Sequence, residues 1–115
     1  MSTIPKAGSK GEEALALHLR ADGIDYEREV KLIHGRKWSW DFVVSKPYVA
    51  GFAIEIQGGT WSKGGHTSGS GVQRDCAKAN AAAVLGYRTL FFTTSMVMDG
   101  TAINTIRAAL VMPEL

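Results

Sequence analysis

The chain has 115 residues, a formal net charge of +2 and 45% apolar residues, and its mean hydropathy is close to zero. This size and balance predict one globular domain over residues 1–115, with residues 1–9 flexible. No apolar run approaches the ~20 residues that a membrane helix needs, and the polar N-terminus lacks a signal-peptide core. We therefore expect no membrane contact and a cytoplasmic location.

The first predicted element is an amphipathic helix over Lys10 to Ala21. Ser9 is placed to cap its N-terminus, and Glu12, three residues later, completes the spacing of a capping box. Gly23 follows the last turn, where glycine commonly ends a helix. Taken alone, this spacing indicates that Glu12 is a capping carboxylate, whose negative charge also interacts favourably with the positive end of the helix dipole.

Three strands are expected next. Alternating side chains predict a strand from Ile24 to Ile33, and a basic turn from His34 to Lys37 leads to a hairpin. The hairpin has strands at Trp38 to Val44 and at Phe52 to Gln57, both with a period of two.

The second half begins with a glycine-rich loop and continues as helix, strand and helix. The expected ranges are loop Gly58 to Gly71, helix Val72 to Leu85, strand Tyr87 to Thr94, and helix Ala102 to Leu110, which begins at Asp99 or Thr101. A helix that connects two parallel strands forms a right-handed crossover. The order therefore predicts an α/β fold with a small mixed sheet flanked by helices.

The hairpin carries the residues of greatest chemical interest. In its first strand Trp38, Trp40 and Phe42 are expected on one apolar face, with the tryptophans in the core. If the large apolar faces of the two strands lie together, then Asp41 and Glu55 meet on the opposite face. Two neighbouring carboxylates form a site for a hard cation such as Mg²⁺ or Mn²⁺.

Two residues beside Glu55 bear on this site. The backbone carbonyl of Ile56 would be a further oxygen ligand. Gln57 shares a face with Glu55 and is able to orient water or bind a metal through its amide oxygen. An amide cannot supply the positive charge that a lysine would place near a reacting phosphate.

Cationic residues near the carboxylates suggest contacts with phosphate groups. Some belong to the glycine-rich loop and the helix after it, and others to the basic turn: Lys63, His66, Arg74, Lys78, Arg36 and Lys37. Lys78 and His66 are equally open to interpretation as solvated charges. Trp61 either stacks on a base or packs under the loop. We interpret Asp75 and Asn80 as caps and loop anchors.

A resemblance to a known family rests on several motifs of this chain. They are W-x-W-D-F, I-E-I-x-G-G-x-W, G-x-H, D-x-x-K-x-N-A and G-Y-R-x-L, between about Lys10 and Leu110. The chain resembles the PD-(D/E)XK nuclease superfamily, and within it the small VRR-NUC-like, phage-associated nucleases that are similar to Holliday-junction resolvases. The resemblance implies a restriction-endonuclease-like αβββαβ core.

The resemblance also implies roles for particular residues. Asp41, Glu55 and the first-helix Glu12 would bind Mg²⁺ or Mn²⁺, and the location would be a bacterial or phage-infected host cell. Gln57 departs from the family, because a lysine is usual at its position. In this superfamily the lysine can instead come from the next helix, where Lys78 is the best candidate.

Three functions remain open at this point. The first is a metal-dependent endonuclease that cuts DNA, for which a branched or structured substrate would favour a homodimer. The second is a nucleic-acid-binding module of the same fold that has lost catalysis, with Gln57 as the mark of that loss. The third is a small α/β domain used in protein assembly, which does not explain a pair of carboxylates on one face.

Overall fold

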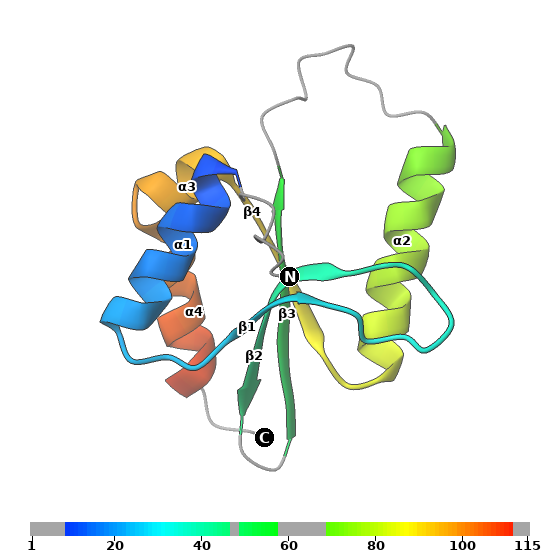
Figure 1. Ribbon diagram of the computed structural model, residues 1–115, viewed down its shortest axis with the longest axis horizontal. Helices are drawn as coiled ribbons and strands as arrows, with labels where there is room; N and C mark the ends of the chain where they lie inside the picture. Colours follow the sequence, from blue (N-terminus) through cyan, green and yellow to red (C-terminus); the bar gives the residue numbers. More distant parts are fainter. Residues whose placement is uncertain (1–8, 47–48, 58–68, 112–115) are drawn as a thin grey trace, which may run out of the picture.

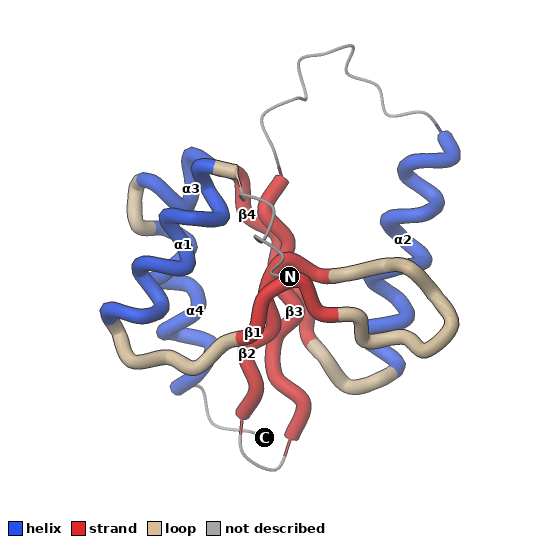
Figure 2. Tube along the Cα trace, viewed as in Figure 1, coloured by secondary structure: helices blue, strands red, loops and turns tan. Residues whose placement is uncertain are grey.

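The structure, a computed structural model, describes residues 9–46, 49–57 and 69–111. Four strands within these residues form one mixed sheet, and helices cover both of its faces (Figures 1 and 2). The elements in chain order are α1 (Lys10–Ala21), β1 (Glu27–Val30), β2 (Trp40–Lys46), β3 (Val49–Gln57), α2 (Gly69–Val84), β4 (Arg88–Thr93), α3 (Thr94–Met98) and α4 (Thr101–Val111).

The strands lie in the order β1-β2-β3-β4. The pairs β1/β2 and β2/β3 are antiparallel, whereas β4 runs parallel to β3 after the crossover through α2. This confirms the predicted fold class of a small mixed sheet flanked by helices. The structure contains one helix, α3, that the sequence pattern did not predict.

One face of the sheet packs against α1, α3 and α4, which lie together on the same side in Figure 1. The largest fully buried side chains of this cluster include Phe42, Phe52, Leu15 and Leu19. Ser9 caps α1 as predicted, because its hydroxyl accepts a hydrogen bond from the Glu12 backbone N–H at 3.2 Å. Burial of these apolar side chains is the dominant favourable term in folding.

The other face packs against α2 through a smaller cluster of Trp40, Val43, Ala53 and Ala82. Most of the α2 side chains that the structure describes are exposed or half-buried. Figure 2 shows α2 on the opposite side of the sheet from the other helices. The long helix is therefore held mainly at its C-terminal end, near Ala82.

The predicted strand from Ile24 to Ile33 is shorter in the structure, where β1 covers Glu27–Val30. Glu29 has a backbone φ of +49°, which side-chain-bearing residues seldom adopt. Tyr26 packs against the α1 side of the sheet, whereas Val30 packs against the α2 side. The positive φ at Glu29 interrupts the simple alternation that the prediction assumed.

The face assignment of Trp40 was also wrong. Trp40 is buried, as predicted, but it belongs to the cluster on the α2 side, while Phe42 belongs to the cluster on the α1 side. Trp38 packs partly buried against the same α2-side cluster as Trp40. Trp40 and Phe42 therefore pack on opposite faces of the sheet, although the register of β1 with β2 continues unbroken past Asp41.

Several element boundaries also changed, and the hairpin strands are Trp40–Lys46 and Val49–Gln57 rather than Trp38 to Val44 and Phe52 to Gln57. Helix α2 begins at Gly69, three residues before the predicted Val72, and residues 58–68 of the predicted loop lie outside the described part of the chain. Helix α3 begins directly after β4 because Thr93 caps it, with its hydroxyl accepting from the Met96 N–H at 3.1 Å.

No helix in the described residues is long and apolar enough to cross a bilayer.

Candidate active site

The site begins where β2 and β3 separate. Their ladder pairs Phe42 with Ile54, and beyond this pair the Asp41 carboxylate accepts a hydrogen bond from the Ile56 backbone N–H at 2.8 Å. Strand N–H groups point toward the neighbouring strand within the plane of the sheet. Asp41 therefore occupies the position of a ladder partner and is held at the end of β3, beside Glu55.

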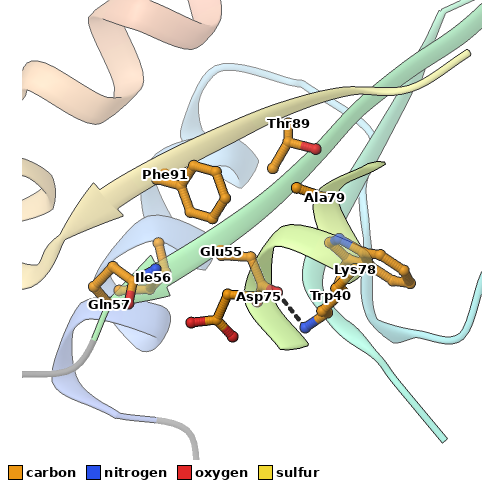
Figure 3. A pocket seen from close by; sticks show the side chains of 9 residues that line it. All are labelled: Trp40, Glu55, Ile56, Gln57, Asp75, Lys78, Ala79, Thr89 and Phe91. Atoms are coloured by element: carbon orange, nitrogen blue, oxygen red, sulfur yellow. Dashed lines mark hydrogen bonds and ion pairs between the residues drawn. The ribbon is translucent and has the colours of Figure 1, made fainter. Parts of the chain in front are cut away.

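Glu55 forms an ion pair with Lys78 of α2, and the two side chains are 15% and 19% exposed (Figure 3). The Lys78 ammonium also lies 4.9 Å from the centre of the Trp40 ring, within range of a cation–π interaction. The structure thus brings together Asp41, Glu55 and Lys78, which belong to two strands and a helix.

Burial raises the pKa of both strand carboxyl groups. For Asp41 the hydrogen bond from Ile56 and the charge of Lys78 oppose this rise. For Glu55 the hydrogen bond from Lys78 opposes the rise, while the nearby Asp41 carboxylate adds to the pKa. A half-buried pair of carboxyl groups that repel each other is stabilised in its ionised form by a nearby cation.

Glu12 lies on α1 and is only 18% exposed, but it does not complete a three-carboxylate site. Its carboxylate lies 3.5 Å from the guanidinium of Arg28, which also pairs with Glu13 at 2.9 Å. Burial raises the pKa of Glu12, and the charge of Asp41 raises it further. Across the described residues, no three His, Cys, Asp or Glu side chains are placed to hold one metal ion. The role of Glu12 as a metal ligand beside Asp41 and Glu55 stays a prediction.

Gln57 ends β3, is exposed, and lines the same pocket as Glu55. The pocket lies between the sheet and α2 and has a volume of about 200 Å³. Sequence reasoning interpreted Asp75 as a cap and did not single out Thr89 or Phe91, yet all three line this pocket. The spacing of two residues between Thr89 and Phe91 in the sequence places both on one face of β4. The sequence does not show the parallel register that places them beside β3.

The predicted phosphate contacts are distributed over separate parts of the structure. Arg36 and Lys37 lie exposed in the segment between β1 and β2, where the Arg36 guanidinium stacks 4.4 Å from the Trp38 ring centre. Arg74 is exposed on α2, with its guanidinium 4.0 Å from the Asp75 carboxylate. The predictions for Lys63, His66 and Trp61 lie outside the described residues.

Comparison with known proteins places this geometry in a recognised fold. No protein-family model matches the chain, and a search of curated proteins also found no match. Among solved structures, the chain is similar to the Homing Endonuclease I-Bth0305I Catalytic Domain, with a TM-score of 0.64. The match covers 91% of this chain and 100% of the other, at 19% sequence identity. The two chains therefore share a fold, and that fold supports an endonuclease catalytic domain in the other protein.

Proposed function

We propose that this chain is a metal-dependent endonuclease that hydrolyses DNA phosphodiester bonds. The observation that carries the proposal is the convergence of Asp41, Glu55 and Lys78 at one end of the central strands. Its support from outside the chain is the fold shared with a homing endonuclease catalytic domain. A purely structural role would not require two half-buried carboxylates and a lysine beside an open pocket.

The donor chemistry of Asp41 and Glu55 fits Mg²⁺ or Mn²⁺. Magnesium usually binds through one or two carboxylates together with water and substrate phosphates, so a third protein carboxylate is not required. The backbone carbonyl of Ile56 is the further oxygen that we assign to this set. Burial raises the pKa of Glu55, and the nearby Asp41 carboxylate raises it further, so a bound cation would stabilise the ionised form of this carboxyl group.

Each residue then has a separate task. Asp41 and Glu55 would hold the cation, which when bound supplies Lewis-acid polarisation of the phosphate. Lys78 provides a positive charge in the pocket that stabilises negative charge developing on the phosphate. Gln57, at the pocket edge, orients a water molecule by hydrogen bonding. Arg36, Lys37 and Arg74, with Lys63 and His66, would contact the phosphate backbone.

Labelled DNA tests this function directly. The protein would be incubated with four-way junction, flap, linear duplex and single-stranded DNA, with Mg²⁺, Mn²⁺ or EDTA, beside the Asp41→Asn variant. We expect cutting that requires the metal and is lost in the variant. Cutting by Asp41→Asn at the wild-type rate, or cutting in EDTA, would contradict the proposal.

One observation favours a second candidate, a DNA-binding module without catalysis. Gln57 stands where the nuclease family that this chain resembles has lysine, and it cannot carry charge. Binding of DNA without cutting in either metal would support this candidate. The pair of Lys78 and Glu55 argues for the active form, because it returns a lysine to the pocket.

The narrower expectations are part of the same proposal. They are the VRR-NUC-like and resolvase-like relationship, a branched DNA substrate, and a homodimer. The substrate panel tests the second expectation, and the mass of the protein in solution with and without a junction tests the third. A strictly monomeric complex with a four-way junction would contradict the homodimer.

A further inference from the structure

A large aromatic side chain is exposed beside the candidate active site. Phe91 on β4 is 47% exposed, whereas the other aromatic side chains whose burial the structure describes are buried or half-buried. The parallel register pairs Phe91 with Glu55 on the neighbouring strand. Figure 3 shows its ring on the wall of the pocket that Glu55 and Lys78 also line.

The same wall contains a hydroxyl group with no hydrogen-bond partner. Thr89 lies two residues before Phe91 on β4, so both side chains project from the same face of the strand. Its Oγ1 is buried, and among the described residues no group forms a hydrogen bond with it. Leaving a buried polar group unpaired destabilises a protein. A rotation of the Thr89 side chain that turned this hydroxyl into the pocket would let a polar ligand relieve the cost.

The remaining walls define what kind of ligand fits. Ala79 and Trp40 add apolar surface, while Glu55, Asp75, Lys78 and Gln57 add charged and polar groups. At about 200 Å³ the pocket is smaller than a typical ligand site. It suits one planar ring system that has an apolar face and a polar edge.

We propose that this pocket receives one unstacked nucleobase of the DNA, next to the bond that is cut. Phe91 is the stacking platform, and the Thr89 hydroxyl is a hydrogen-bond partner for the base edge. This inference rests on the proposed nuclease function and names its substrate class. The enzyme would act on DNA with an unpaired nucleotide, because a base within a continuous duplex is not available to the pocket.

Fluorescence and anisotropy in EDTA test the inference without cleavage. The probe is a single-stranded oligodeoxynucleotide with one 2-aminopurine, and a duplex with the same base is the comparison. Because stacking of a base on an aromatic ring stabilises the complex, Phe91→Ala should weaken single-strand binding about tenfold. The quenching of 2-aminopurine fluorescence should also be lost. Duplex binding should change little. Thr89→Val, which replaces the hydroxyl with a methyl group of similar size, should weaken single-strand binding by a smaller factor.

Two further variants make the result specific. Phe91→Tyr retains an aromatic face and should bind nearly as the wild type does. Met98→Ala removes a side chain of similar exposure, 50%, from α3, which packs on the opposite face of the sheet, and should change nothing. Far-UV circular dichroism and the melting temperature would show that each variant is folded.

The outcomes separate this inference from the proposed function. Unchanged binding and quenching in Phe91→Ala would overturn the base pocket, as would a wild-type protein that does not bind single-stranded DNA. Phe91-dependent binding by a protein that cuts no DNA with Mg²⁺ or Mn²⁺ would support the base pocket and overturn the nuclease. Metal-dependent cutting that does not depend on Phe91 would support the nuclease and overturn the base pocket.

Discussion

The Asp41 carboxylate accepts a hydrogen bond from the Ile56 backbone N–H at 2.8 Å, across the gap where β2 and β3 separate. This bond satisfies a strand N–H that would otherwise require another partner. It also holds the Asp41 carboxyl group beside the residue that precedes Ile56, which is Glu55. The end of a regular strand ladder thus becomes the place where two carboxylates meet.

Asp41→Asn should retain the fold but lose cleavage. The asparagine oxygen can still accept the Ile56 N–H bond, so the end of β3 remains in place. Loss of the negative charge should reduce cutting at least ~100-fold, as expected when a metal site loses a group that orients or binds the metal. DNA binding by anisotropy should change little. Asp25→Asn, at an exposed position, is the matched control, and equal loss in both variants would contradict a specific role for Asp41.

Divalent metal should stabilise the protein through Glu55. A ligand that binds only the folded state stabilises it by about 2.7 kcal/mol at a free concentration of 100 times Kd. Thermal unfolding with increasing Mn²⁺ should therefore show a rising melting temperature for the wild type and a flat one for Glu55→Gln. Equal rises in the two proteins would place the metal elsewhere.

Lys78→Ala should reduce the cleavage rate by roughly 100-fold if this lysine stabilises charge on the phosphate. Lys31→Ala, at an exposed position outside the site, is the control for general loss of positive charge. Gln57→Lys in the Lys78→Ala background should restore part of the rate, because it returns a cation to the pocket edge. A fully active Lys78→Ala protein would contradict a role in catalysis and leave Lys78 only as the ion-pair partner of Glu55.

Gly51→Ala should destabilise the hairpin strongly. A Cβ atom at Gly51 would lie 1.8 Å from the backbone carbonyl oxygen of Val44, so the backbone itself must move. We expect a loss of about 3 kcal/mol or more in urea unfolding, within the range of severe overpacking. Gly35→Ala is the control: its φ is +85° but nothing lies within 4 Å, so it should cost only about 1 kcal/mol. Similar losses would contradict the predicted clash.

The ion pair between Asp22 and Arg107 joins the end of α1 to α4, with Arg107 Nη2 donating to Asp22 Oδ1 at 2.9 Å. Its hydrogen bonds lower the pKa of Asp22 below the ordinary value of 3.8. The pair therefore stabilises the fold above pH 3.8, and this stabilisation is lost as the pH falls through the lowered pKa. Arg107→Gln should raise the Asp22 pKa toward its ordinary value in an NMR titration. An unchanged pKa would show that the pair does not persist in solution.

Local patterns in the sequence determined the elements and the class of fold. Helix α1 has the predicted bounds because Ser9, the apolar spacing and Gly23 all act within a few residues of one another. The alternating strands and the crossover helix predicted a mixed sheet, which the structure shows. The carboxylates of Asp41 and Glu55 were found as a pair because hairpin strands pair antiparallel over short distances.

Tertiary structure alone decided the contacts that build the site. The positive φ of Glu29 interrupts the alternation of β1, and Trp40 packs on the opposite face from Phe42. A period of two in the sequence does not reveal either change. The pair of Lys78 with Glu55 and the register of Phe91 with Glu55 depend on how α2 and β4 dock on β3. Docking is decided by burial summed over the whole core, so no local pattern contains it.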